Sequence, residues 1–313
     1  MGFAGAMVVA MMVDALLGWP DALFARIGHP VTWLGRLIET LDKLWNQASR
    51  RPAVRRAAGL AAALIVIALA LAIAAAVQSL LLSAWSRILV VGILGWPLVA
   101  LRSLHDHVSA VRLALEHRDI GAAREAVARI VGRDAALLDE AGLARAAIES
   151  LAENTSDAVV APVFWGALFG LPGIVAYKAI NTLDSMIGHL TPRHEAFGWA
   201  AARIDDLANF IPARVTGILF VVLARSPSTA LSCMVRDGRR HRSVNAGWPE
   251  AAMAGALGVR LSGPRVYQGR LAGEPWLNEG ARDPGAEDIL AGLKLYRRAM
   301  MLLAGVLIAL ALV

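Results

Sequence analysis

The sequence predicts an all-α, polytopic integral membrane protein with about four to six membrane-embedded helices, some broken or re-entrant, joined by cytosolic helical segments. Hydrophobic residues make up 57% of the 313 positions, and the mean hydropathy is +0.55. Soluble domains usually contain about 45–50% apolar residues. No stretch of useful length alternates apolar and polar residues as a strand does, so helices are the expected elements throughout.

The clearest membrane span is the stretch 57–86, which carries no charged residue. A spanning helix needs about 20 consecutive apolar residues, so this segment is long enough to cross a bilayer. The N-terminal run lacks the basic start of a signal peptide, so we expect it to be retained. The weaker candidates are short or contain a proline or an acidic residue: 1–17, 88–101, 158–177, 211–224 and 299–313.

Three polar segments lie between these runs. Apolar residues recur with helical spacing over 31–45, beside two tryptophans, which predicts an amphipathic helix at the membrane surface. Residues 102–157 form a polar helical stretch, and residues 225–298 hold most of the Gly and Pro turns. We expect both to be cytosolic parts of a single integral membrane domain, 1–313.

The charge pattern suits a membrane protein. The net charge is +6, from 31 basic and 25 acidic residues. Such a surplus also occurs in nucleic-acid-binding proteins, but basic cytoplasmic loops explain it here. The stretch 18–56 has seven basic residues against three acidic ones, and 225–298 has twelve against seven. We therefore expect no nucleic-acid partner, and a multi-pass protein of the inner (cytoplasmic) membrane. Cys233 is the only cysteine, which excludes an internal disulfide and a cysteine metal cluster.

The first candidate cluster lies in "ESLAENTSDAVVAPVFWGAL", residues 149–168. On a helix Glu149, Glu153 and Asp157 fall at i, i+4 and i+8 and share one face, with Asn154 beside them. A solvated helix face explains most acidic triplets. Here the face leads directly into an apolar run, and ionisable groups next to a membrane are costly and usually functional.

The second cluster, "YKAINTLDSMIGH", follows that apolar run. Lys178, Asn181 and Ser185 share one helix face, with Asp184 at its edge. A lysine here could simply extend its ammonium group to the membrane surface. The polar neighbours favour a functional role instead.

The third cluster, "RIDDLANFIPAR", brings Asp205, Asp206 and Asn209 within about a quarter turn of one another. Magnesium is usually held by one or two carboxylates together with substrate phosphates, so these oxygen ligands suit it. Helix capping explains Asp205 alone but not all three residues.

The fourth cluster is "GRRHRSVNAGWPEAAMAGALG". Three arginines precede a turn, and Pro249 with Glu250 opens a short helix that ends near Gly258. A helix N-terminus beside arginines can bind an anion. A basic cytoplasmic loop is the alternative explanation of the arginines.

Familiar catalytic signatures are missing from the sequence: G-x-x-x-x-G-K-[ST], H-E-x-x-H and G-x-S-x-G do not occur. Carboxylates and amides near Lys and Arg suit magnesium–phosphate chemistry. They also suit a cation-coupled transporter, so the residues alone leave both open.

The ordered motifs resemble those of one enzyme family. "DALLGWP…GHPVTWLGRLIETLD", the segment that contains "ESLAENTSDAVVAPVFWGAL", "AYKAINTLDSMIGH", "RIDDLANFIPAR" and "NAGWPEAAMAGALGVRLSGP" follow one another from about 14 to about 269. They closely resemble the CobD/CbiB family of cobalamin biosynthesis, the adenosylcobinamide-phosphate synthases. The stretch 57–86 and the C-terminal tail match only in character.

The resemblance implies an ATP- and Mg²⁺-dependent amide ligation on the cytoplasmic side of the membrane. The substrates would be the corrinoid adenosylcobyric acid and an amino-alcohol phosphate such as aminopropanol O-phosphate, and other cobalamin-pathway enzymes could dock. A carboxylate is a poor acyl donor, so phosphorylation would first supply a leaving group. The competing interpretations are a corrinoid or anion transporter and a non-catalytic membrane sensor or assembly subunit.

The resemblance also implies roles for the clustered residues. The expected catalytic residues are Glu149, Glu153, Asp157, Lys178 and Asp184. The expected magnesium ligands are Asp205 and Asp206. The expected substrate-binding residues are Asn154, Asn181, Ser185, Asn209, Arg214, Asn245 and Glu250.

The topology places one constraint on this picture. If every apolar run spans, segment 177–210 lies across the membrane from 102–157 and 225–298, which would divide the ATP chemistry between two sides. We therefore expect that 158–177, with its two prolines, or the short 211–224 run does not cross as a simple lipid-facing span.

Overall fold

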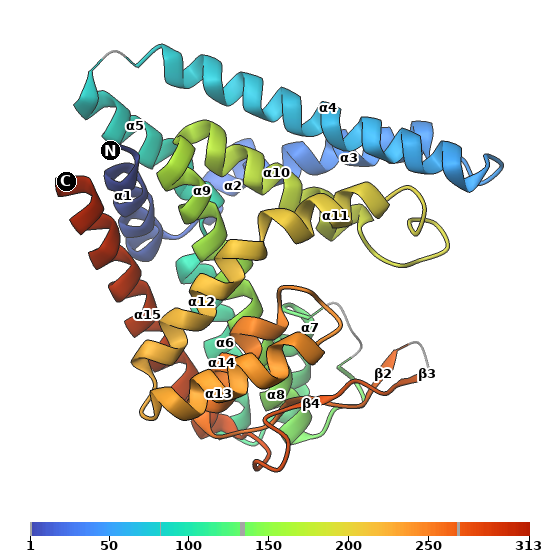
Figure 1. The fold of residues 1–313 in the computed structure, drawn as a ribbon, viewed down its shortest axis with the longest axis vertical. Coiled ribbons are helices and arrows are strands. Elements are labelled where there is room, and N and C mark those ends of the chain that lie inside the picture. The colour runs from blue at the N-terminus through green and yellow to red at the C-terminus, as the bar shows by residue number, and fades with distance from the viewer. Residues whose placement is uncertain (1, 82, 132–134, 268–269) are drawn as a thin grey trace. The chain divides into compact units, whose positions relative to one another are not determined.

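The structure is a computed structural model that describes residues 2–81, 83–131, 135–267 and 270–313. It is helical nearly throughout, which confirms the predicted all-α polytopic class. The chain packs as two compact units whose segments alternate along the sequence (Figure 1). Unit 1 comprises Met1–Ala100, Ala161–Asn209 and Val306–Val313, and unit 2 comprises Leu101–Val160 and Phe210–Gly305. That the whole chain acts as one membrane domain stays a prediction.

Unit 1 contains a long apolar helix flanked by shorter ones. Prolines occupy the first turn of three of its helices, where a missing N–H costs nothing. The amphipathic segment expected over 31–45 is a helix that begins one residue earlier. Its elements are α1 (Gly2–Leu17), α2 (Asp21–Ile27), α3 (Pro30–Trp45), α4 (Pro52–Ser79), α5 (Ala84–Gly95), the 3₁₀ turn η1 (Trp96–Leu98), α9 (Ala161–Phe169), α10 (Leu171–Ile187) and α11 (Trp199–Ala208).

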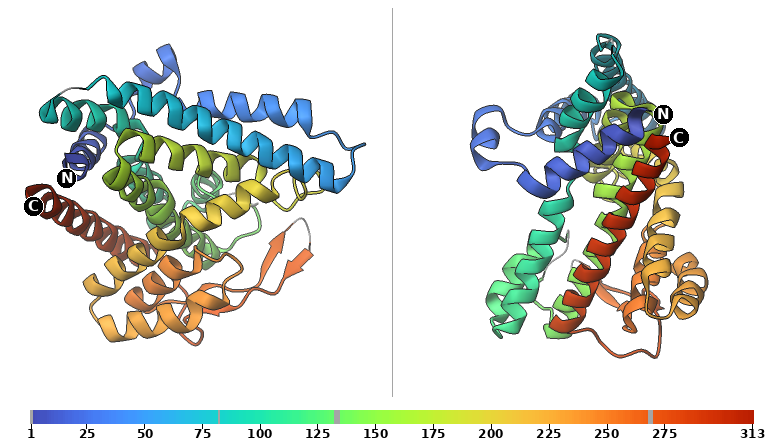
Figure 2. Two further views of the ribbon diagram at one scale, coloured as in Figure 1. Left: turned by 45° about the horizontal axis from the view of Figure 1, so that its top comes forward. Right: turned by 90° about the vertical axis from the view of Figure 1, so that its left-hand side faces the viewer.

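The core of unit 1 forms where α4 packs against α10 and α3, which run beside it in Figures 1 and 2. Small residues on one face of α4 allow this close approach. Ala62, Ala63 and Ala70 are buried there against α10 and the segment that leads into α11. Gly59 approaches closest, because a Cβ at this position would lie 1.8 Å from the carbonyl oxygen of Phe197.

The apolar run 158–177 is broken, as its prolines led us to expect. Helix α9 ends at Phe169 and α10 begins at Leu171, with Gly170 between them at φ +71°, a backbone conformation that favours glycine. The break therefore falls at Gly170, and Pro172 lies in the first turn of the next helix. Gly173 then lets α10 approach α9 closely, since a Cβ there would lie 2.1 Å from the carbonyl oxygen of Trp165.

Unit 2 contains the expected polar helices and four short strands. Strand β1 pairs antiparallel with β4, and β2 with β3, all within the Gly- and Pro-rich segment 225–298. The elements are α6 (Leu101–Glu116), α7 (Ile120–Ala128), α8 (Glu140–Asn154), the π-helix η2 (Thr155–Val160), α12 (Phe210–Leu223), α13 (Pro227–Asp237), the 3₁₀ turn η3 (Gly238–Arg240), α14 (Gly247–Leu257), β1 (Leu261–Ser262), β2 (Arg265–Tyr267), β3 (Arg270–Ala272), β4 (Trp276–Leu277) and α15 (Ala286–Leu312), whose last residues belong to unit 1.

Helices α12, α13 and α14 pack closely in unit 2 because glycines face their neighbours. A Cβ on Gly255 of α14 would lie 2.7 Å from the Cβ of Cys233 on α13. A Cβ on Gly217 of α12 would lie 2.7 Å from the methyl carbon of Met234. These contacts fix α14, whose N-terminal turn carries the fourth cluster.

Three helices of the described residues are long and apolar enough to cross a membrane: α4, the continuous stretch Trp85–Glu116, and α15. Two bent pairs could raise the number to five. One of these pairs joins α11 to α12 through a bend of 45°. By length and composition, therefore, a candidate span includes the beginning of 102–157, the segment expected to be cytosolic.

Candidate functional site

The carboxylates of α10 and α11 lie together in unit 1. Asp184 on α10 is partly buried, and this burial raises the pKa of its carboxyl group. His189 lowers the pKa of Asp184, whereas the negative charge of Asp206 on α11 raises it further. The structure thus brings Asp184 and Asp206, which are 22 positions apart, close enough to interact electrostatically.

Asn209 fixes the neighbouring acid on α11. This asparagine is buried, and its Nδ2 donates to Oδ2 of Asp205 over 3.0 Å. Its Oδ1 accepts a hydrogen bond from the hydroxyl of Tyr177 over 2.8 Å. Asp206 instead forms an ion pair with Arg203 one turn earlier, at 2.9 Å. The two adjacent acids are both partly buried but have different partners, an amide for Asp205 and a guanidinium for Asp206.

The other predicted residues of α10 lie at its accessible side. Lys178 and Asn181 are partly buried, and Ser185 is exposed. The Ser185 hydroxyl donates to the carbonyl oxygen of Asn181 over 2.8 Å, a bond within its own helix. The positive charge of Lys178 acts on His29 at the start of α3. This lysine thus lies among unit 1 polar groups.

The donor set of α10 and α11 fits a magnesium ion that arrives with a nucleotide. Such ions are usually held by one or two carboxylates plus phosphate oxygens. Asp205 and Asp206 can supply those carboxylates, and a cation here would relieve the negative field that Asp206 imposes on Asp184. Within the described part of the chain, no three His, Cys, Asp or Glu side chains converge as a dedicated metal centre.

The acidic stretch of the first cluster does not form the single straight α-helix that its spacing predicts. Helix α8 ends at Asn154, and the next six residues form the π-helix η2. A π-helix has a wider turn than an α-helix, so Asp157 is no longer directly in line with Glu149 and Glu153. Short π segments occur frequently at functional sites.

Glu149 holds a turn of the backbone in unit 2. Its carboxylate is buried and accepts a hydrogen bond from the backbone N–H of Ser262 over 2.7 Å. Ser262 has φ +60°, and Gly263 follows with φ +86°. One role of Glu149 is therefore to stabilise a left-handed turn 113 positions away in the sequence.

The other members of the first cluster are more accessible. Glu153 is exposed, and Asp157 is partly buried. Asn154 Nδ2 donates to the carbonyl oxygen and the hydroxyl of Ser150, at 3.0 and 3.2 Å. The buried hydroxyl of Ser156 in η2 has no hydrogen-bond partner among the described residues.

Arg214 and Asn245, two of the expected substrate-binding residues, contact each other in unit 2. Arg214 Nη1 donates to Asn245 Oδ1 over 2.6 Å, and Nη2 donates to the carbonyl oxygen of Val244 over 3.2 Å. The guanidinium group also lies over the rings of Phe210 and Trp248, at 3.8 and 4.6 Å from their centroids. These contacts hold the arginine beside the first turn of α14.

Glu250 lies in the same turn of α14 and is buried. Its Oε2 is 3.7 Å from Nε2 of His241, which is itself almost fully buried. The exposed side chains of Arg240 and Arg242 lie in the preceding segment. The predicted anion site thus has its helix start and its arginines in one unit, and α14 ends at Gly258 as expected.

Three polar groups with partners distant in sequence escaped the sequence analysis. Asp42 of α3 is buried and accepts two hydrogen bonds from Arg193. Asp283 accepts hydrogen bonds from Arg260 and Arg145, and these bonds lower the pKa of its carboxyl group to about 2. The guanidinium groups of both arginines lie over the ring of Trp276. Local spacing carries no signal for such pairs.

Asp237 is the third of these groups. It is buried, and both its oxygens accept from Arg236 while Oδ2 also accepts from the backbone N–H of Asn278. Burial, and to a smaller extent the negative charge of neighbouring Asp237, raise the pKa of the Cys233 thiol to about 12. The thiol is therefore protonated, and unreactive, at neutral pH.

The predicted site residues thus form two sets. Unit 1 holds Lys178, Asn181, Asp184, Ser185, Asp205, Asp206 and Asn209. Unit 2 holds Glu149, Glu153, Asn154, Asp157, Arg214, Asn245 and Glu250. That both sets serve one active site stays a prediction.

Comparison with known proteins gives consistent matches. Residues 7–296 match the family model described as "CobD/Cbib protein". The chain is 60% identical over 300 residues to "Cobalamin biosynthesis protein CobD" of Rhodobacter capsulatus, covering 96% of this chain and 95% of that protein. The protein of the same name from Brucella suis is 45% identical over 317 residues, with 97% and 96% covered. No solved structure matches the chain.

Proposed function

Since this chain belongs to the CobD/CbiB family, we propose that it is an ATP-dependent amide ligase, an adenosylcobinamide-phosphate synthase. Family membership makes it an enzyme of cobalamin biosynthesis, and its helices make it a polytopic membrane protein. The proposed reaction joins a propionate carboxylate of adenosylcobyric acid to the amine of aminopropanol O-phosphate or a similar amino-alcohol phosphate. The product is adenosylcobinamide phosphate. The family match over 7–296 is the observation that carries the proposal.

In the first step, a carboxylate oxygen of the corrinoid attacks the γ-phosphorus of ATP, and ADP leaves. The acyl phosphate that forms has a good leaving group, which a carboxylate lacks. Asp205 and Asp206 would hold a magnesium ion, which would supply positive charge against the transferring phosphoryl group. Lys178 in the same unit adds a positive charge for phosphate or corrin carboxylates.

In the second step, the amine attacks the acyl carbon, and inorganic phosphate leaves. The amine must first lose a proton from its ammonium form. Among the acids of α10 and α11, Asp184 suits this role because burial and Asp206 raise its pKa, which makes it a stronger base. Asn181 and Ser185 on the same helix, and Asn209 beside Asp205, would orient the reacting groups.

The phosphate of the amino alcohol is assigned to unit 2. Arg214 is fixed by Asn245 and by two aromatic rings beside the first turn of α14. Arginine in such a fixed position binds phosphate well, and helix N-termini favour anions. Glu250 would then receive the ammonium end of the amino alcohol. The remaining acids, Glu149, Glu153 and Asp157 with Asn154, would bound the nucleotide site.

The proposal has a direct test. The full-length protein, purified in lipid nanodiscs, is incubated with adenosylcobyric acid, aminopropanol O-phosphate, ATP and Mg²⁺. The corrinoids are then separated and identified by mass spectrometry. We expect the amide product and stoichiometric ADP, with neither formed when ATP or magnesium is omitted. Intact substrates without product would contradict the proposal. Corrinoid flux into proteoliposomes without product would instead establish the transporter alternative.

A further inference from the structure

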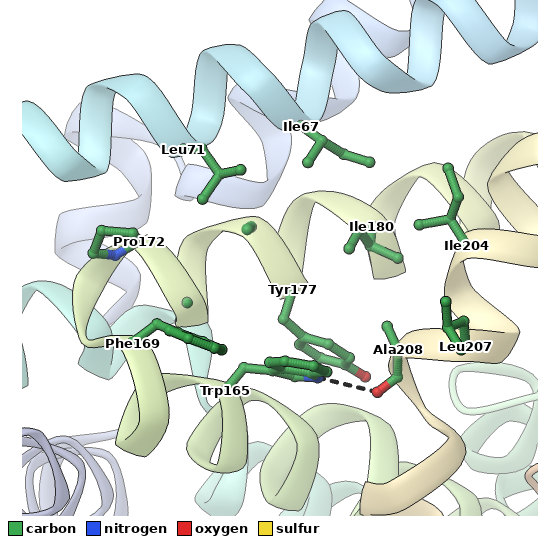
Figure 3. A pocket seen from close by; sticks show the side chains of 12 residues that line it. Ile67, Leu71, Trp165, Phe169, Pro172, Tyr177, Ile180, Ile204, Leu207 and Ala208 are labelled. Atoms are coloured by element: carbon green, nitrogen blue, oxygen red, sulfur yellow. Dashed lines mark hydrogen bonds between the residues drawn. The ribbon is translucent and has the colours of Figure 1, made fainter.

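Unit 1 contains a cavity of about 530 Å³ that the proposed reaction does not use. Helix α4 forms one wall, and α9, α10 and α11 form the others (Figure 3). Its size falls within the range of about 300–1,000 Å³ that is usual for small-molecule sites. The lining side chains are almost entirely apolar. They are Ile67, Leu71, Trp165, Phe169, Pro172, Gly173, Ala176, Tyr177, Ile180, Ile204, Leu207 and Ala208.

The polar groups of the two polar side chains in the lining, Trp165 and Tyr177, are already hydrogen-bonded to protein groups. Trp165 Nε1 donates to the carbonyl oxygen of Ala208 over 3.0 Å, the dashed line in Figure 3. The Tyr177 hydroxyl donates to Asn209 over 2.8 Å. The two rings pack together with Ile180, and the partly buried ring of Trp165 borders the space (Figure 3). A ligand of this cavity is therefore recognised by its apolar surface and shape.

The cavity opens beside residues that a membrane protein exposes to lipid. Leu207 is 77% exposed and Phe169 is 55% exposed, and both belong to the lining. On α4 the lining residues Ile67 and Leu71 share one helix face with the exposed residues Leu60 and Leu64. The lining thus forms one continuous apolar surface with the outer face of a candidate membrane span.

The position of the cavity along α4 places it at the depth of the acyl chains. Helix α4 has 28 residues, so it is about 42 Å long. The lining residues Ile67 and Leu71 are centred about 5 Å from its midpoint. The hydrocarbon core of a bilayer is about 30 Å thick. When α4 spans, Ile67 and Leu71 therefore lie within the hydrocarbon core.

Two contacts keep the wall in place around the space. Gln78 Oε1 accepts a hydrogen bond from the backbone N–H of Leu171 over 2.8 Å, which joins the end of α4 to the start of α10. Near the other end, Gly59 brings α4 against Phe197. Because α4 is fixed on both sides of the cavity, the space is preformed and a ligand need not open it.

From its apolar lining, its opening and its depth, we propose that this cavity binds an acyl chain of a bilayer phospholipid. The inference is independent of the ligase function. The break at Gly170 helps to form this cavity, because the turn between α9 and α10 places Trp165 and Phe169 opposite Ile67 and Leu71.

Photocrosslinking tests the proposal. The full-length protein is reconstituted in phosphatidylcholine vesicles that contain a phosphatidylcholine with a diazirine in the middle of one acyl chain. After irradiation, adducts are mapped by mass spectrometry. We expect adducts on the partly buried lining residues Trp165 and Ile180 as well as on the exposed lining residue Leu207. Adducts confined to outward-facing residues such as Leu207 would overturn the proposal.

Cavity-filling variants provide the matched controls. Ala176→Phe fills the space from α10, and Ile67→Trp fills it from α4. Each should lower the adduct yield at Trp165 by about tenfold while the protein keeps its thermal transition. Ile73→Phe adds similar bulk on α4 outside the lining and should leave the yield unchanged. Unchanged yields in both cavity variants would overturn the assignment. Loss of the wild-type adducts when adenosylcobyric acid is added would also overturn it, because the corrinoid would then be the occupant of the cavity.

Discussion

Asp184 is the predicted catalytic residue whose pKa is shifted by its surroundings in the fold. Its pKa is raised by burial and by the charge of Asp206, so it ionises at higher pH than an ordinary aspartate. A proposed base acts only when ionised, so kcat/KM should fall on acidification through this raised pKa. In Asp206→Asn one cause of the rise is removed. We expect the acidic limb of the pH profile of kcat/KM to move to lower pH than in the wild type.

Two comparisons complete this test. Asp184→Asn removes the titrating group and should lower kcat by about 10²–10⁴-fold, the usual contribution of general base catalysis. Glu39→Gln is the control: it removes an exposed carboxylate of α3 in the same unit and should leave the pH profile unchanged. If the acidic limb of the Asp206→Asn profile does not move, Asp206 does not influence the ionisation of Asp184. Full activity of Asp184→Asn would remove this residue from the reaction.

At the scale of elements, the close contact of α4 with the segment before α11 depends on one glycine. Gly59→Ala would place a Cβ 1.8 Å from the backbone oxygen of Phe197, so one of the two segments must move. We expect a loss of stability of about 1–3 kcal/mol, the usual cost of overpacking, measured as a lower thermal transition in detergent. Gly305→Ala is the matched control, since a Cβ there meets no atom within 4 Å, and alanine favours a helix by about 1 kcal/mol over glycine. Equal transitions for both variants would contradict the packing.

The π-helix η2 is the second element with a specific consequence. Deleting Ala158 would shorten this six-residue π segment and let α8 continue as an α-helix. Everything after it would then rotate relative to Asp157, so we expect loss of ligase activity in a protein that still inserts into the membrane. Deletion of Ala48, in the exposed connection between α3 and α4, should leave activity intact. Normal activity without Ala158 would show that the π-helix has no role at the site.

At the scale of the whole molecule, composition and periodicity predict much of the fold. The charge-free run 57–86 lies largely in α4, and the amphipathic segment 31–45 lies in α3. The spacing of polar residues also predicts the face of Lys178, Asn181 and Ser185 with Asp184 at its edge, and the separate group of Asp205, Asp206 and Asn209. These features are local, so they can be found from sequence alone.

The rest depends on contacts between distant positions or on subtle backbone changes. Glu149 meets Ser262 across 113 positions, and Asp42 meets Arg193 across 151. The sequence of Thr155–Val160 predicts an ordinary α-helix but forms a π-helix, so Glu149 and Glu153 lie at i, i+4 on α8 as expected, whereas Asp157 lies beyond the end of that helix. The prolines did indicate a break in 158–177, but Gly170 fixes its position because it alone takes a left-handed φ there.

The predicted topology can be tested because the native cysteine is unreactive. Cys233 is buried and its pKa is raised to about 12, so a thiol reagent at neutral pH reports only an introduced cysteine. Glu195 and Glu279 are exposed, one in each unit. With Glu195→Cys and Glu279→Cys in intact cells, we expect a membrane-impermeant maleimide to label neither until the cytoplasmic face is opened. Labelling of Glu195→Cys from the periplasmic side alone would contradict a shared cytoplasmic site.

The central claim is that the protein activates a corrinoid carboxylate with ATP before forming the amide. Adenosylcobyric acid labelled with ¹⁸O in its free propionate carboxylate tests this most directly, because one carboxylate oxygen must leave with the transferred phosphoryl group. With aminopropanol O-phosphate, ATP and Mg²⁺, we expect one ¹⁸O atom in inorganic phosphate for each amide formed, read by mass spectrometry. Label in AMP, or amide formed without label in phosphate, would contradict the account.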